Sequence, residues 1–164
     1  MLLMDKVPAV SPGPRVEVSA ALLFQGGRLL ITRRPMGSHL GGLWEFPGGK
    51  REPGETFEAC LQRELREELG IRVAVGPCWA TVEHAYPERT VEIRFFLCRL
   101  LSGQPRPLGC SAIKWVGRQT LRRHRFPAAD TAILERLVRT PDLWREDSVP
   151  GPEARSFESQ PRGR

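Results

Sequence analysis

The sequence predicts an α+β domain in which helices pack on a β-sheet. Short apolar stretches of strand-like composition are separated by turns rich in Gly and Pro, and two longer stretches carry apolar residues at helical spacing. A chain of 164 residues has the size of one compact domain with tails. We therefore expect one domain over residues 15–140, an N-terminal tail over 1–14 and a flexible C-terminal tail over 141–164.

The strands are predicted from apolar patterns that end at turn residues. Residues 16–24 and 28–32 flank a Gln-Gly-Gly turn and predict a hairpin. A glycine-rich loop follows over residues 35–42, and a polar turn ends at Glu55. Further strands are expected over residues 71–75, 78–84, 90–100 and 113–116, with a turn over 86–89.

Two helices are expected. Thr56 can cap the first helix, and Gly70 ends it at the position that a C-terminal glycine prefers. Between them, apolar residues recur at helical spacing: Phe57, Leu61, Leu65 and Leu69. The second helix is predicted over residues 128–138, because its apolar pattern is closed by the proline at 141.

The composition, 40% hydrophobic and 27% charged, is that of a soluble globular protein. No apolar run approaches the roughly 20 residues that a membrane span needs, and residues 1–10 lack the pattern of a signal peptide. We therefore expect a cytoplasmic location and no membrane partner. The net charge of +6 favours anionic partners, either phosphates, nucleic acid or a membrane surface, and does not choose among them.

Three glutamates form an acidic cluster on the first predicted helix. Glu64, Glu67 and Glu68 lie at i, i+3 and i+4, so they project beside the leucine stripe instead of opposite to it. Like charges at this spacing destabilise a helix, and the negative end of the helix dipole adds to the repulsion. A hard divalent cation, Mg²⁺ or Mn²⁺, would compensate because it takes carboxylate oxygens. Glu55, at the helix start, is favoured by the dipole and can brace the loop before it.

Residues 49–71 carry a motif that resembles a known family. Their sequence, GKREPGETFEACLQRELREELGI, matches the Nudix box at every defined position. The resemblance covers residues 16–138 and extends to MutT-like enzymes in the segments 31–34, 43–50, 86–89 and 126–130. It implies an α/β/α Nudix sandwich with a mixed β-sheet, and hydrolysis of a nucleoside triphosphate by water to the monophosphate and pyrophosphate.

MutT-like enzymes remove oxidised nucleotides from the nucleotide pool. The resemblance therefore implies an 8-oxo-dGTP diphosphatase that uses Mg²⁺, requires no nucleic-acid polymer and acts as a monomer or homodimer. It also implies that Glu64, Glu67 and Glu68 bind the metal together with a carbonyl of Gly49. Arg63 resembles the residue that orients these glutamates, and Glu64 resembles the residue that orients or deprotonates the attacking water.

The substrate-binding residues are implied by the segments outside the box. Arg34 resembles a residue that contacts phosphates in related enzymes, and Lys50 lies in a matching segment. Phe46 and Leu23 fit a nucleobase pocket and fit the hydrophobic core equally well. Asp130 stands where MutT carries an asparagine, and an ionised aspartate only accepts hydrogen bonds.

The aspartate leaves an alternative open. Related enzymes with aspartate at this position include cytidine triphosphate pyrophosphohydrolases, so the alternative is a pyrophosphohydrolase of CTP, dCTP or modified pyrimidine nucleotides. Residues 105–112 lack the extra metal-binding glutamate of many MutT-like enzymes, and Glu83, Glu88 and Glu92 are the candidates to replace it. A non-catalytic base-recognition module of a DNA repair enzyme is a remoter alternative, because such a module would have lost acidic residues of the box.

Overall fold

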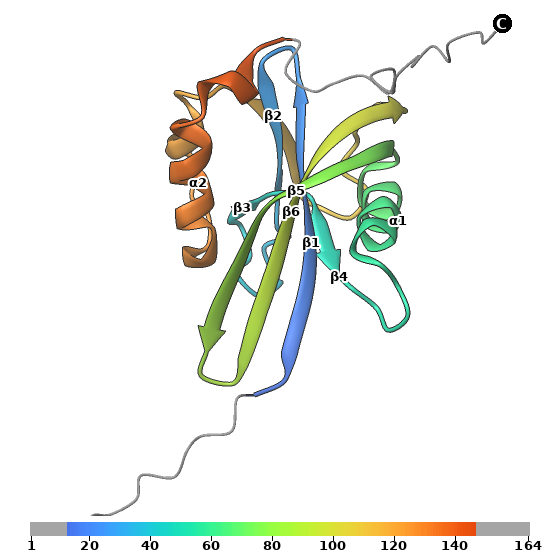
Figure 1. Cartoon of the computed structure of the whole chain (residues 1–164), viewed down its shortest axis with the longest axis vertical. Helices are drawn as coiled ribbons and strands as arrows, with labels where there is room; N and C mark the ends of the chain where they lie inside the picture. The colour runs from blue at the N-terminus through green and yellow to red at the C-terminus, as the bar shows by residue number, and fades with distance from the viewer. Residues whose placement is uncertain (1–12, 147–164) are drawn as a thin grey trace, which may run out of the picture.

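A mixed β-sheet lies between two helices in the computed structural model, which describes residues 13–146 (Figure 1). Helices α1 (Phe57–Leu69) and α2 (Thr131–Val138) cover opposite faces. The strands are β1 (Arg15–Gln25), β2 (Arg28–Arg33), β3 (Trp44–Glu45), β4 (Gly48–Lys50), β5 (Arg72–Tyr86), β6 (Arg89–Ser102) and β7 (Ala112–Val116). Three 3₁₀ helices are η1 (Leu121–Arg123), η2 (Ala128–Asp130) and η3 (Pro141–Trp144). The predicted α+β sandwich is confirmed.

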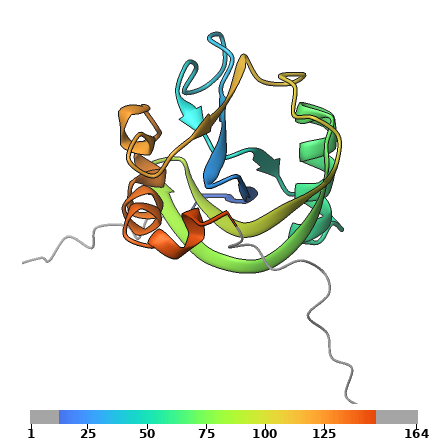
Figure 2. The same ribbon diagram turned by 90° about the horizontal axis from the view of Figure 1, so that it is seen from above.

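Strand β1 is the centre of the sheet, whose order is β3-β2-β1-β6-β5, with β4 paired to β1 and β7 paired to β2. It runs parallel to β6, from Arg15 opposite Thr90 to Leu23 opposite Cys98, and antiparallel to β2 and β4. Viewed from above, β5 and β6 curve from the α2 side to the α1 side (Figure 2). Within residues 13–146, none of the helices has the length and apolar character needed to cross a bilayer.

Local signals place α1 where the sequence predicts it. The Thr56 hydroxyl accepts a hydrogen bond from the Ala59 amide, and Gly70, at a φ of 68°, closes the helix through its own amide. The leucine stripe of this helix is fully buried against the sheet: Leu61, Leu65 and Leu69. Their burial aligns the neighbouring acidic side of α1 with the rim of the sheet.

Residues alternate along β1 between two core layers. Leu22 packs with the layer under α2, whereas Leu23 packs with the layer under α1. The layer under α2 is rich in aromatic residues and includes Phe46 and Phe95. The layer under α1 is richest in leucine, and a cavity lies on the α2 side.

The structure differs from the prediction in a pair of expected strands and at the start of the second expected helix. The strands expected over residues 71–75 and 78–84 are one strand, β5, whose register shifts between Val75 and Cys78. Pro77 has no amide to donate, so the strand forms a bulge there and continues. In the segment predicted as helix 128–138, the first three residues form η2 and the α-helix begins at Thr131.

The packed domain extends beyond residue 140, where the C-terminal tail was expected to begin. Residues Pro141–Trp144 form η3, and the Trp144 indole donates to the Leu137 carbonyl at 2.9 Å. The indole also meets Phe24 edge to face, at 5.2 Å between ring centroids. The rest of the predicted C-terminal tail, 147–164, and most of the predicted N-terminal tail, 1–12, lie outside the described residues.

Replacing Trp144 with Ala is expected to destabilise the protein by about 2 kcal/mol, because the half-buried indole loses its hydrogen bond and its contact with Phe24. Urea unfolding measures this change as a lower midpoint. The variant Leu101→Ala, at a side chain that is 49% exposed, should unfold close to the wild type. An unchanged midpoint for the tryptophan variant would show that η3 adds nothing to stability.

Candidate active site

The acidic side of α1 forms one half of the candidate site. The side chains of Glu64 and Glu67 differ in exposure, at 15% and 60% respectively, and Glu68 is half-buried. Burial raises the pKa of Glu68 to about 7, with further contributions from the nearby carboxylates of Glu64 and Glu45. Burial also raises the pKa of Glu64. Two glutamates of the cluster are therefore held in surroundings that disfavour their negative charge.

Arg63 connects the loop before α1 to these glutamates. Its Nε donates to Oε1 of Glu55 at 2.6 Å, and its Nη1 donates to Oε1 of Glu64 at 2.8 Å. A longer bond of 3.4 Å reaches Glu67. The Arg63 guanidinium, together with the Glu52 amide, lowers the pKa of Glu55 to about 2. Arg63 therefore contacts both the loop and the glutamates, which are the contacts that the predicted roles require: Arg63 orients the glutamates and Glu55 braces the loop.

Strand β4 brings the Gly49 backbone against the acidic side of α1. A Cβ atom on Gly49 would lie 2.5 Å from both carboxylate oxygens of Glu64, so any side chain there would force the Glu64 carboxylate to move. The Gly49 carbonyl also accepts a weak hydrogen bond from the thiol of Cys60, at 3.6 Å. Gly49 and Glu64, which are distant from each other along the motif, are thus brought together as the resemblance implies.

The donor set suits a hard divalent cation. Its members are carboxylate oxygens and a backbone carbonyl, which Mg²⁺ and Mn²⁺ prefer over sulfur or nitrogen ligands. A cation would also offset the charge that burial disfavours on Glu64 and Glu68. As the side chains of residues 13–146 stand, no three His, Cys, Asp or Glu groups converge on one point. A bound ion would therefore draw on side-chain rotation and on oxygens of water or substrate, as Mg²⁺ commonly does.

Replacing Gly49 with Ala is expected to lower kcat by about a hundredfold, because the new methyl group must displace the Glu64 carboxylate. Steady-state kinetics at saturating Mg²⁺ measures the loss. Gly37→Ala is the matched control, since a Cβ there meets nothing within 4 Å. Equal activity of the two variants would show that the approach of β4 to Glu64 has no part in catalysis.

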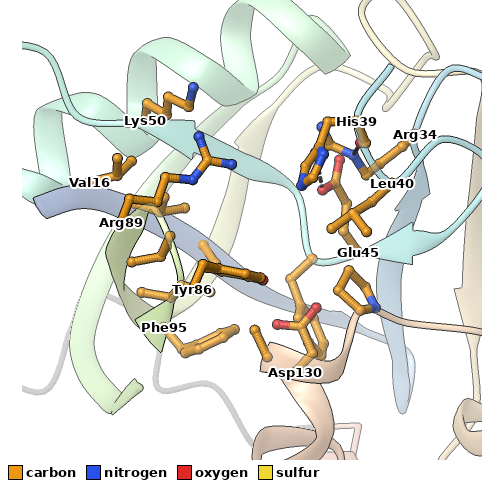
Figure 3. Close-up of a pocket in the computed structure, with 17 residues that line it drawn as sticks. Val16, Arg34, His39, Leu40, Glu45, Lys50, Tyr86, Arg89, Phe95 and Asp130 are labelled. Carbon is orange, nitrogen blue, oxygen red and sulfur yellow. Dashed lines mark hydrogen bonds and ion pairs between the residues drawn. The ribbon is translucent and has the colours of Figure 1, made fainter. Parts of the chain in front are cut away.

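A cavity of about 270 Å³ on the α2 side forms the other half of the site (Figure 3). Its apolar wall includes Ala20, Phe46 and Phe95, and its rim carries charged side chains from five segments of the chain. The predicted pocket residue Phe46 lies in this wall. The prediction for Leu23 is wrong: this side chain is fully buried in the layer under α1, because neighbouring residues of β1 point to opposite faces.

Two carboxyl groups lie at one side of the cavity. Glu45 is ion-paired with Arg34 at 2.8 Å, and the Arg34 Nε donates to the His39 carbonyl at 2.7 Å. Asp130 is 6% exposed, makes no capping hydrogen bond to α2, and points into the cavity (Figure 3). Burial, and secondarily the charge of Glu45, raises the pKa of Asp130 to about 7. With this pKa, part of the Asp130 population is protonated near neutral pH, and a protonated carboxyl can donate as well as accept.

Two cationic side chains stand at another side of the cavity. Lys50 and Arg89 both line it and lie near each other (Figure 3). The Arg89 Nε is buried and has no hydrogen-bond partner within the described residues. The sequence analysis missed Arg89 and Glu45 as site residues. Both lie in segments that carry the MutT resemblance, but only the folded chain brings Arg89 and Lys50, which come from β6 and β4, to the same cavity.

The three candidates for an extra metal ligand, Glu83, Glu88 and Glu92, lie on β5, in the turn after it and on β6, respectively. Arg15 and Arg94 engage the Glu92 carboxylate, and Arg15 also pairs with Glu83 at 3.1 Å. Glu88 lies in the turn between β5 and β6. The loop before β7, which lacks a glutamate, instead binds the end of α1 through backbone amides: those of Leu108 and Gly109 donate to the Glu68 carbonyl.

Two curated proteins and one solved structure illustrate what this chain is similar to. An 8-oxo-dGTP diphosphatase of Proteus vulgaris is 51% identical over 84 residues, which cover 51% of this chain and 75% of that protein. The CTP pyrophosphohydrolase of Escherichia coli strain K12 is 34% identical over 123 residues, 75% of this chain and 91% of that protein. The solution structure of the E. coli ORF135 protein aligns with a TM-score of 0.68 and 32% identity, covering 78% of this chain and 91% of that one.

A family model described as the NUDIX domain matches residues 19–136. The matched range begins in β1, ends in α2 and contains both halves of the site. Because the match takes in most of the chain, and because relatives align over nearly their whole length, this protein belongs to the Nudix domain family.

Proposed function

We propose that this protein is a MutT-like nucleoside triphosphate pyrophosphohydrolase that uses Mg²⁺, or Mn²⁺ in its place. The observation that carries the proposal is the continuity of the two halves of the site: Gly49 faces the acidic side of α1, and the next residue, Lys50, lines the cavity. A nucleotide whose base enters the cavity would place its phosphates beside Lys50 and Arg34, next to the glutamates. We propose a cytoplasmic location, where the nucleotide pool is found.

The reaction adds one water across a phosphoanhydride bond, so that the monophosphate and pyrophosphate leave. Glu64, Glu67 and Glu68, with the Gly49 carbonyl, would hold the metal, which when bound supplies charge neutralisation and a more acidic water. Glu64 would orient or deprotonate the attacking water, and Arg63 would keep this carboxylate in place. Arg34 and Lys50 would bind phosphate oxygens, because both carry positive charge on the rim of the cavity.

The proposed substrate is 8-oxo-dGTP. The name of the Proteus relative supports it, and so does the partly protonated Asp130, which can both donate and accept toward an oxidised purine. CTP or dCTP is the second candidate. It is favoured by the aspartate itself, because a carboxylate accepts from an exocyclic amino group, and by the name of the 34% identical E. coli relative.

Pyrophosphate release from 8-oxo-dGTP, dGTP, CTP, dCTP and ADP-ribose tests the proposal. We expect the highest kcat/KM for 8-oxo-dGTP with Mg²⁺, and a strong loss of activity in the Glu67→Gln variant. A preference for CTP or dCTP would move the enzyme to pyrimidine nucleotide turnover. No release from any triphosphate would refute the hydrolase function and favour the non-catalytic base-recognition module.

A further inference from the structure

Arg51 ties the loop before α1 to strand β1. Its amide donates to the Glu17 carbonyl at 2.8 Å, and its Nε donates to the Glu17 carboxylate at 2.6 Å, with a second guanidinium contact to the same oxygen. The third nitrogen of the Arg51 guanidinium group, Nη1, donates to the Glu55 carbonyl at 2.6 Å. The side chains of Arg51 and Glu17 are both about three-quarters buried, so their ion pair is partly shielded from water.

Arg63 also holds this loop, through the Lys50 carbonyl at 3.2 Å and the Glu55 carboxylate, and the middle of the loop has few attachments. Glu52, Pro53 and Gly54 are exposed, and Gly54 has a φ of 83°. Inside the loop, the Glu52 amide donates to the Glu55 carboxylate at 2.9 Å. The loop is therefore anchored at its two ends, and Arg51 takes part in both anchors through one rigid guanidinium group.

The end of the loop at Glu55 contacts the candidate site through Arg63. Glu55 presents both carboxylate oxygens to Arg63, at 2.6 and 3.0 Å, and Arg63 in turn donates to Glu64. A continuous set of hydrogen bonds thus runs from β1 through Arg51 and Glu55 to the glutamate that is proposed to act on water. Displacement of the loop would be passed on to Glu64 through Arg63.

We propose that Arg51, held by Glu17, is a positioning residue for catalysis: it fixes the backbone of Glu55 so that Arg63 and Glu64 keep their places. The proposal rests on the proposed function, since it assigns Arg51 a part in the same site. Arg51 and Glu17 lie at no defined position of the Nudix box, so this device belongs to this chain's own residues. Lysine could not replace Arg51, because a single ammonium cannot donate to Glu17 and to the Glu55 carbonyl in this fixed fork.

The chain offers a matched control. The Arg94 guanidinium lies 3.9 Å from the centre of the Phe57 ring, and Arg51 lies 5.1 Å from the same centre. Arg94 pairs with Glu92 at 2.7 Å, so both arginines combine a glutamate partner with a contact to this ring. Of these two arginines, only Arg51 donates hydrogen bonds to the loop before α1. Arg94→Gln therefore removes a similar charge and ring contact without touching residues 51–55.

The experiment compares Arg51→Gln, Arg51→Lys and Glu17→Gln with Arg94→Gln in the full chain. We expect kcat for the best triphosphate substrate to fall about tenfold in the first three variants, with KM within about twofold of the wild type. Arg94→Gln should keep the wild-type kcat, and melting temperatures should fall by similar amounts in all glutamine variants. A kcat loss in Arg94→Gln equal to that in Arg51→Gln, or full kcat in Arg51→Lys, would overturn the proposal.

Hydrogen exchange without substrate or metal separates this proposal from the proposed function. The amides of residues 51, 52 and 54–56 should exchange at least about tenfold faster in Arg51→Lys and Glu17→Gln than in the wild type and in Arg94→Gln, because the anchor of the loop is lost. Unchanged exchange would refute the positioning role whatever the activity. Faster exchange with no triphosphate hydrolysis by the wild type would leave the anchor established and refute the proposed function.

Discussion

Replacement of Glu64 with Gln is expected to lower kcat by about a thousandfold. The amide keeps the shape of the carboxylate but loses its charge, so it binds a cation poorly and cannot accept a proton from water. Glu64 is also the glutamate that lies closest to the Gly49 backbone and the one bound by Arg63 at 2.8 Å. Release of pyrophosphate under saturating substrate and Mg²⁺ measures the effect.

Glu58→Gln provides the control for this substitution. Glu58 lies on the same helix, in its first turn, and is exposed. Its replacement should change kcat by less than about twofold, because no part of the site contacts it. A Glu64→Gln enzyme with more than about a tenth of the wild-type kcat would mean that another group acts on water.

Replacement of Asp130 with Asn is expected to change the substrate ranking by about tenfold to a hundredfold in favour of 8-oxo-dGTP over CTP. Asparagine always offers both a donor and an acceptor, whereas aspartate offers a donor only while protonated. Ratios of kcat/KM for the two nucleotides, measured at pH 8 where Asp130 is mostly ionised, give the largest contrast. An unchanged ranking would mean that Asp130 does not read the base.

The same variant should alter the pH dependence of stability. The pKa of Asp130 is about 7 in the folded protein and about 3.9 in an unfolded chain, so the folded state binds the proton more tightly. Its contribution to the free energy of unfolding is therefore fully present below pH ~4 and is lost as the pH rises through 7. Each tenfold difference in proton affinity is worth about 1.4 kcal/mol, so the loss is on the order of a few kcal/mol.

Asparagine carries no charge at any of these pH values. Urea unfolding should therefore show a stability gain of Asp130→Asn over the wild type that grows between pH 5 and pH 8. Glu45, the carboxylate whose charge also acts on Asp130, shows a pKa raised by burial and contributes in the same direction. A pH-independent difference between the two proteins would contradict a buried, ionisable Asp130.

The amino-acid sequence by itself determined the elements whose signals are local. Helix α1 is bounded by Thr56 and Gly70 as predicted, because a capping hydroxyl and a left-handed glycine act on backbone groups within a few residues. The acidic cluster was likewise predictable, since glutamates at i, i+3 and i+4 lie on one side of a helix. The Nudix family could be recognised because its motif is one contiguous loop and helix.

Only the tertiary structure decided what depends on distant contacts. Phe46 and Leu23 were equivalent in the sequence. In the folded chain Phe46 lies in the layer under α2, where it lines the cavity, whereas the pleat of β1 places Leu23 in the layer under α1. The pairing of Arg51 with Glu17 spans 34 residues and leaves no periodic signal. The protonation of Asp130 depends on burial and on Glu45, and both arise only when segments far apart in the chain exclude water from the same space.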